Sequence, residues 1–180
     1  QEKDGKGSGA KGEKGGEPEI MNDKKMDDVF SDNGLCALGE NSVFSFLCDE
    51  KFREISGYFQ TKKFKAGETI WEEGDSCDYV AIVASGRVEV KKKTEFEGKY
   101  VIVGLFNKGA IVGAMCILDD SPRSITAVAL EDVSLLVISK DKLEELISSK
   151  PEIGVQLLKG MLLSLSMRLR QSFERLAKFF

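Results

Sequence analysis

Residues 111–126 read Ile-Val-Gly-Ala-Met-Cys-Ile-Leu-Asp-Asp-Ser-Pro-Arg-Ser-Ile-Thr. The stretch combines Gly113, a short apolar segment and the tripeptide Pro122-Arg123-Ser124. A glycine lets the backbone approach a ligand closely, and an arginine donates charge-assisted hydrogen bonds to phosphate oxygens. This stretch therefore indicates a cradle for a phosphate group.

On both sides of this stretch, short runs of β-branched and aromatic residues alternate with turns. The runs lie between Lys62 and Ser139 and include residues 69–71, 79–83, 88–90, 100–103, 125–128 and 133–138. Glycines separate them, at Gly67, Gly74, Gly86, Gly98 and Gly109. Many short strands with turns between them are typical of an antiparallel sandwich or barrel.

Helices are expected before and after these strands. Between Asn41 and Gln60, Phe52, Ile55 and Phe59 have helical spacing, which predicts a short amphipathic helix. A second short helix is expected over residues 141–148. Pro151 then fits the first turn of a long helix that runs to the end of the chain.

The long helix carries a heptad pattern. Apolar residues recur every seventh position, at Val155, Leu162, Leu169 and Leu176. A helix packed on its own sheet would show a similar stripe, but a helix over 151–180 would be about 45 Å long and a barrel of this size is roughly 30 Å across. We therefore expect a parallel homodimer that forms through residues 155–179.

Composition excludes several classes of function. The chain has 180 residues, a formal net charge of −4 and no histidine. An acidic chain is poorly suited to bind nucleic acid or an anionic membrane, and the absence of histidine removes the usual base of a catalytic triad. Asp119-Asp120 could form a carboxylate pair, but adjacent acids before Ser-Pro are more often turn formers. We expect a protein that is not an enzyme.

The remaining features concern location and domain organisation. The four cysteines stand singly, which predicts separate, partly buried thiols in a reduced, cytoplasmic setting: Cys36, Cys48, Cys77 and Cys116. No apolar run approaches the roughly 18 residues of a spanning helix. The chain divides into a disordered or weakly structured tail (1–40), a β-roll domain with flanking helices (41–150) and the long dimerisation helix (151–180).

The whole arrangement resembles the cyclic-nucleotide-binding domain. The resemblance rests on the turns Phe64-Lys65-Ala66-Gly67-Glu68, Glu73-Gly74-Asp75 and Ala84-Ser85-Gly86-Arg87, then Gly109, Gly113, Pro122-Arg123-Ser124 and two closing helices. It implies an α+β fold, an antiparallel, jelly-roll-like β-roll with a short N-terminal helix and C-terminal helices. The family includes sensor domains of catabolite-activator-type regulators, kinase regulatory subunits and gated channels.

The resemblance also implies a ligand site. In the family a phosphate cassette opens with a glycine, matched by Gly113, and continues in a short helix whose N–H groups face the phosphate. Arg123 matches the arginine that pairs with the phosphate, and Ser124 lies beside it. The expected contacts in this chain are Gly113, Ala114, Met115, Arg123, Ser124 and Ile125 in the cassette, with Val101, Val103 and Arg168 around the base.

Three positions depart from the family pattern. Ala114 stands where the family usually has a glutamate that accepts a hydrogen bond from the ribose hydroxyl. Ala110 replaces an acid that often follows the turn glycine, and Ile125 replaces a small residue. Losing a hydrogen bond to a charged acceptor costs about 1.5–3 kcal/mol, so cyclic AMP or cyclic GMP is expected to bind in a weak or altered way.

Three hypotheses about function remain open. In the first, the domain senses a small anionic, phosphate-bearing ligand through Arg123 and signals through its dimeric helix to a downstream protein. In the second, the pocket is vestigial and the domain is a constitutive dimer or a docking platform. In the third, the chain is the sensor half of a transcription regulator without its DNA-binding domain, because no basic recognition helix lies within these residues.

Overall fold

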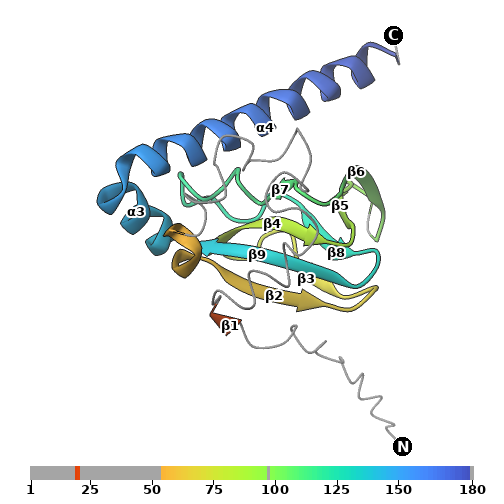
Figure 1. Cartoon of the computed structure of the whole chain (residues 1–180). Helices are drawn as coiled ribbons and strands as arrows, with labels where there is room; N and C mark the ends of the chain where they lie inside the picture. The colour runs from red at the N-terminus through yellow and green to blue at the C-terminus, as the bar shows by residue number, and fades with distance from the viewer. Residues whose placement is uncertain (1–18, 21–53, 97, 179–180) are drawn as a thin grey trace, which may run out of the picture.

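The computed structural model describes residues 19–20, 54–96 and 98–178. These residues form two antiparallel sheets that pack into a roll, with helices at one side (Figure 1). The α+β fold with an antiparallel β-roll is therefore confirmed.

Each sheet joins strands that are distant in the sequence. One sheet has five strands in the order β1 (Glu19–Ile20), β2 (Gln60–Phe64), β9 (Val133–Ser139), β4 (Tyr79–Ser85) and β7 (Ile111–Val112). The other has four in the order β3 (Thr69–Trp71), β8 (Thr126–Ala129), β5 (Val88–Lys93) and β6 (Tyr100–Phe106).

The five-stranded sheet is covered on both faces. In β9, Leu135 and Val137 face the cluster between the two sheets, whereas Leu136 and Ile138 face a cluster that includes the helices. This division follows from the alternation of side chains along a strand. A sheet buried on both faces explains why β9 reads as a continuous apolar run rather than an alternating one.

Two helices follow β9 and lie against this sheet. Helix α3 (Lys140–Ser149) begins at Ser139, whose hydroxyl accepts a hydrogen bond from the Lys142 N–H at 3.3 Å. Helix α4 (Pro151–Ala177) has Pro151 in its first turn, as predicted. Neither helix has the length and apolar character needed to cross a membrane, within the part of the chain described.

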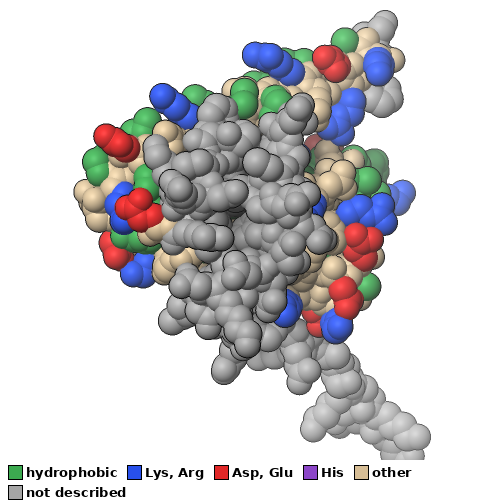
Figure 2. Space-filling model, in the orientation of Figure 1, with side chains coloured by type: hydrophobic (Ala, Val, Ile, Leu, Met, Phe, Trp, Pro, Cys, Tyr) green, Lys and Arg blue, Asp and Glu red, His purple; other side chains and the backbone are tan. Residues whose placement is uncertain are grey.

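Helix α4 buries side chains against the roll only along its first half, and beyond it Arg168 and Arg175 still contact β6. Its buried side chains end at Ser164, and the helix then projects past the sheets (Figure 1). The residues of the predicted heptad stripe are exposed, with Leu162 at 65% and Leu169 at 55%. Figure 2 shows apolar side chains along this helix between lysine and arginine side chains. Val155, Leu162, Leu169 and Leu176 thus lie away from the face that packs on the roll, whereas Leu158, offset by three in the same predicted heptads, packs against the core.

Some predicted boundaries differ from the structure. Strand β7 has only two residues and no alternating pattern of its own, so no sequence pattern predicted it. The predicted helix over 41–60 lies mostly outside the described residues; residues 54–55 are helical and Ser56–Tyr58 form a 3-10 turn, but Gln60 already begins β2.

The predicted tail is described at only two positions. Residues 19–20 form β1, which pairs with Gln60 and Thr61 of β2. This pairing satisfies backbone groups at the sheet edge, and the prediction of a disordered or weakly structured tail over 1–40 otherwise lies outside the described residues and stays a prediction.

Candidate functional site

A cavity of about 60 Å³ lies between the stretch that follows β7, strand β3, the end of β6 and the middle of α4. Its lining residues are Trp71, Phe106, Ile111, Gly113, Ala114, Met115, Cys116, Arg123, Ser124, Ile125, Leu165 and Arg168. The structure therefore brings together all the predicted cassette contacts and Arg168, although Arg168 is 45 residues beyond Arg123 in the chain.

Arg123 is buried at the wall of this cavity, with 2% of its surface exposed. Its Nη2 donates to the carbonyl of Tyr79 at 2.7 Å, and its Nη1 donates to the carbonyl of Gly113 at 3.3 Å. The guanidinium also stacks on Trp71, 4.1 Å from the ring centroid, which is a cation–π geometry. Burial lowers the pKa of Arg123 from its ordinary value. The side chain is thus held by an aromatic ring and at both outer nitrogens.

Gly113 is required by this packing. Its φ is +77°, a conformation that residues with a Cβ rarely adopt. A Cβ at this position would clash with Nη1 of Arg123 and would lie 3.3 Å from the Trp71 ring. The glycine therefore allows both the backbone turn and the approach of the arginine.

Arg168 enters the cavity from α4. Its guanidinium carbon lies 3.5 Å from the centroid of the Phe106 ring. Burial, with a smaller contribution from the nearby Arg175, lowers the pKa of Arg168 to about 10. Arg168 therefore remains charged at neutral pH, although desolvation makes the charge unfavourable.

The electrostatics of the cavity favour an anion. Among the described residues that line it there is no aspartate or glutamate, and apart from the arginines most of them are apolar. The Nε atoms of Arg123 and Arg168 are buried and have no hydrogen-bond partner within the described part of the chain. Buried cations and donors without acceptors are costly, so a negatively charged group with several acceptor oxygens would match this cavity.

The other cassette residues have distinct environments. Ala114 is 8% exposed, packs in the cluster with Ile111 and Ile117, and offers no acceptor. Met115 is 64% exposed at the cavity rim. The backbone carbonyl of Ser124 accepts from Lys92 Nζ at 2.9 Å.

Ile125 contributes through its backbone as well as its side chain. Its side chain packs against the cluster between the sheets, and its carbonyl accepts from Trp71 Nε1 at 3.0 Å. This bond fixes the indole on which Arg123 stacks. Ile125 therefore supports the arginine as well as narrowing the cavity.

Val101 and Val103 do not line the cavity. Both lie on β6, where they are 54% and 39% exposed. The carbonyl of Val103 accepts a hydrogen bond from Arg175 of α4 at 3.2 Å. The two valines therefore belong to an exposed apolar surface beside the second half of α4.

The structure corrects two expectations about the cassette. Residues 113–125 form bends and turns, not the short helix that the family resemblance implied. Cys77 and Cys116, predicted as separate thiols, form a disulfide with a Cα–Cα distance of 5.9 Å. The two cysteines are 39 residues apart, so their spacing did not predict a bond between them. The fold of the roll brings the loop before β4 against the cassette. Cys36 and Cys48 lie outside the described residues.

Sequence reasoning missed the aromatic residues of the site. Trp71 and Tyr79, whose rings meet edge to face, both contact the Arg123 guanidinium, and Phe106 contacts the guanidinium of Arg168. Their positions in strands suggested core packing, and no local pattern links them to an arginine. The one available signal was that Trp71 is the chain's single tryptophan and lies in a short strand beside a glycine turn.

The acidic pair has a structural role. Asp119 accepts from the Ser121 N–H at 3.1 Å and from the Ser121 hydroxyl at 2.7 Å, which closes the turn. Asp120 pairs with Lys140 at the start of α3. No cluster of three potential metal ligands occurs in the described residues.

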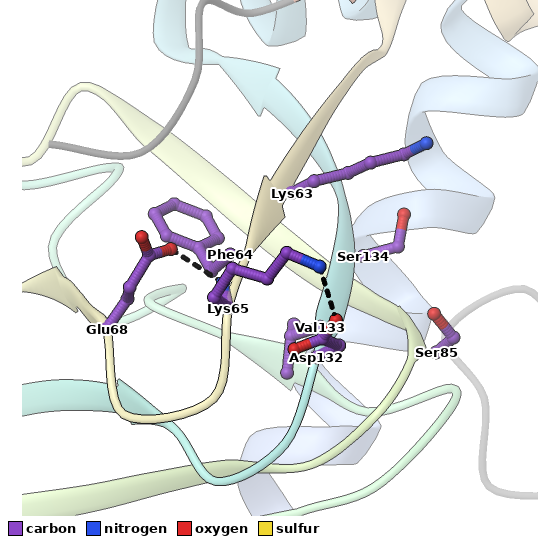
Figure 3. A pocket seen from close by; sticks show the side chains of 8 residues that line it. All are labelled: Lys63, Phe64, Lys65, Glu68, Ser85, Asp132, Val133 and Ser134. Carbon is purple, nitrogen blue, oxygen red and sulfur yellow. Dashed lines mark hydrogen bonds and ion pairs between the residues drawn. The ribbon is translucent and has the colours of Figure 1, made fainter.

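A second, larger cavity of about 340 Å³ lies between the end of β2 and the start of β9 (Figure 3). Its main cation is already paired, since Lys65 Nζ lies 2.7 Å from Asp132 Oδ2. Both side chains are mostly exposed, so water screens them. Ser134 Oγ is buried without a partner among the described residues at this hollow, but both of the lysines that line it are exposed, so it lacks the buried cation that marks the first cavity.

Comparison with known proteins is consistent with this geometry. The family model described as the cyclic nucleotide-binding domain matches residues 61–150. The chain is 31% identical over 112 residues to the cyclic AMP receptor protein of Thermus thermophilus, which covers 62% of this chain and 51% of that protein. It is 26% identical over 152 residues to the CRP-like cAMP-activated global transcriptional regulator of Mycobacterium tuberculosis, covering 84% of this chain and 62% of the regulator.

Other similarities extend the range of relatives. A cAMP-dependent protein kinase regulatory subunit of Aspergillus fumigatus is 31% identical over 116 residues, which is 64% of this chain and 27% of the subunit. Among solved structures, a cyclic nucleotide-binding domain from Methylobacillus flagellatus superposes with a TM-score of 0.74 at 26% identity, covering 88% of this chain and 85% of that one. The chain thus spans between about a quarter and three fifths of these curated relatives.

Proposed function

The chain belongs to the cyclic nucleotide-binding domain family, and we propose that it is a non-enzymatic sensor that binds a small phosphate-bearing anion between Gly113, Arg123 and Arg168. The observation that carries this proposal is the buried Arg123 beside the half-buried Arg168, each with a buried Nε that has no partner, at a cavity whose described lining residues include no carboxylate. An anion there would compensate charges whose burial is otherwise unfavourable.

The two arginines have different parts in the proposal. Arg123 is the anchor, because the rings of Trp71 and Tyr79 hold its plane and preorganise its fork for phosphate oxygens. Arg168 lies on α4, so it connects an anion in the cavity with the helix that leaves the roll. Gly113 and Ser124 line the cavity beside the anchor.

We propose that cyclic AMP and cyclic GMP bind this site weakly. Ala114 gives the ribose hydroxyl no acceptor, which costs about 1.5–3 kcal/mol or roughly ten- to a hundredfold in affinity. The cavity of about 60 Å³ is also smaller than the roughly 300 Å³ at which ligand pockets begin, so the cassette has to open to admit a nucleotide.

We also propose that α4 forms the seam of a homodimer. The exposed heptad residues Leu162, Leu169 and Leu176 form an apolar stripe that the roll does not cover. Val101 and Val103 on β6 extend this apolar surface and are assigned to the dimer rather than to the base of a nucleotide. Ligand binding that moves Arg168 would shift the packing of the two α4 helices, and thereby signal to a partner protein.

A ligand-free docking platform is the second candidate function. The observation in its favour is that backbone carbonyls already satisfy both outer nitrogens of Arg123. In that role Arg123 would only brace the cassette against Tyr79 and Trp71. Binding measurements separate the two functions.

The test is calorimetric titration of the dimeric protein with inorganic phosphate, cyclic AMP and cyclic GMP. Arg168→Gln should weaken binding about tenfold or more, because it removes a buried charged donor. The matched control is Arg170→Gln, which removes an exposed arginine two residues away on the same helix. If no probe binds the wild type, the sensor function is wrong and the docking platform is favoured. If a probe binds and both variants bind it like the wild type, Arg168 does not contact the anion.

A further inference from the structure

The Cys77–Cys116 disulfide crosses the wall of the anion cavity. Cys116 lies in the cassette, lines the cavity and is 2% exposed. Cys77 lies in the loop between β3 and β4, is partly exposed, and packs at the edge of the apolar cluster under the cassette. The disulfide is therefore a covalent link between the cassette and a neighbouring loop, with one sulfur closer to solvent than the other.

This disulfide contacts the residues that form the anchor. The Sγ of Cys116 lies 3.8 Å from Nη1 of Arg123. Both sulfurs lie within 3.9 Å of the Gly113 carbonyl, the same oxygen to which Arg123 donates. A change in the bonding of these sulfurs thus acts directly on Gly113 and Arg123.

The loop and the cassette are tied together at two places. At one end, the N–H of Arg123 donates to the Asp75 carbonyl at 2.8 Å, and the N–H of Gly74 donates to the Arg123 carbonyl at 2.8 Å. At the other end, the tie is the disulfide. Residues 113–125 contain no helix or strand in the structure, so the disulfide is a major constraint on how far this segment can move.

We propose that Cys77 and Cys116 form a redox-controlled clamp on the anion cavity. The proposal rests on the anion-binding function proposed above. The disulfide holds the cassette against the loop and keeps the cavity near 60 Å³, too small for a nucleotide. Reduction removes this link, allows residues 113–121 to move outward, and raises the affinity for a phosphate-bearing ligand.

The chemistry is thiol–disulfide exchange with a thiol reductant such as glutathione or a dithiol protein. The reductant's thiolate attacks the more exposed Sγ of Cys77, forms a mixed disulfide there, and the electron pair of the broken bond leaves on Cys116. The positive charge of Arg123 stabilises the departing Cys116 thiolate. A second reductant thiolate then releases Cys77, so the protein gains two electrons and two protons and the reductant becomes a disulfide. Oxidised glutathione reverses the sequence.

The first experiment reports on the clamp without any ligand. The full chain is oxidised with oxidised glutathione or reduced with dithiothreitol, and peptide mass spectrometry should show Cys77 linked to Cys116 only in the oxidised sample. Hydrogen exchange of the amides in residues 113–121 should be at least tenfold faster after reduction. Absence of the crosslink, or equal exchange in both states, would overturn the clamp whether or not an anion binds.

The second experiment reports on regulation. Calorimetry with cyclic AMP and with inorganic phosphate should give a dissociation constant at least tenfold lower for the reduced protein. Cys77→Ser should bind like the reduced wild type in both conditions, whereas the control Cys48→Ser should keep the redox response. Equal affinity in both redox states would show that the disulfide does not regulate binding, and would leave the sensor function intact. Failure of both probes in both states refutes the sensor function, and with it the regulatory claim.

Discussion

Replacing Gly113 by alanine should destabilise the protein far more than an ordinary glycine substitution. Gly113 has a φ of +77°, and moving an alanine into this left-handed region costs roughly 1–2 kcal/mol. The new Cβ would also clash with Nη1 of Arg123, which must move and lose its hydrogen bond to the Gly113 carbonyl. A lost hydrogen bond from a charged group costs about 1.5–3 kcal/mol. The expected total is about 2.5–5 kcal/mol.

Gly67→Ala is the matched control for this prediction. Gly67 has a φ of +85°, but the space around its missing Cβ is open within 4 Å. This variant should therefore lose only the roughly 1–2 kcal/mol of backbone strain. Urea unfolding of both variants against the wild type gives the two free energies of unfolding.

The same pair of variants also tests the site. Gly113→Ala should abolish anion binding measured by calorimetry, because Arg123 no longer holds its place, whereas Gly67→Ala should bind like the wild type. Equal losses of stability in the two variants would refute the reasoning, since they would show that the close approach of Arg123 to Gly113 contributes nothing.

Three further predictions concern the ligand, the dimer and pH. Ala114→Glu should strengthen cyclic AMP binding about tenfold or more in calorimetry, because it provides a charged acceptor, while Ala114→Gln should gain less affinity. No gain from the glutamate would exclude a nucleotide whose ribose lies beside position 114. Leu169→Asp should convert a dimer to a monomer in analytical ultracentrifugation, whereas the control Arg170→Asp should remain a dimer. A wild-type protein that is already a monomer would contradict the proposed α4 dimer interface. Cyclic AMP binding should persist at pH 8 and fall as the pH rises through about 10, because Arg168 loses its proton there; an unchanged affinity at pH 11 would show that Arg168 does not contact the anion.

The arrangement of Arg123 does not depend on the residue at position 114. The guanidinium is bound by two carbonyls and two rings that belong to the fold itself. In the proposed function, Ala114 therefore removes one contact for a ribose without displacing Arg123, which we propose as the phosphate anchor.

Local chemistry made much of the fold predictable from the sequence. Alternating β-branched runs and glycine turns predicted most strands, because a strand's side-chain period and a turn's φ are local properties. The start of α4 followed from Pro151 in the same way. Strand β7 and the turns of residues 113–125 were not predictable, because their conformations depend on the sheet and the disulfide that they contact.

The sequence alone determined which groups are available to the site: Gly113, Arg123, the missing acid at Ala114 and the apolar heptads of α4. Only the tertiary structure decided how these groups meet. It placed Arg168 beside the cassette, set Arg123 against Trp71 and Tyr79, and joined Cys77 to Cys116. The physical reason is that each of these contacts joins residues from distant parts of the chain. Such contacts depend on the register and packing of the sheets, which no local pattern of residues encodes.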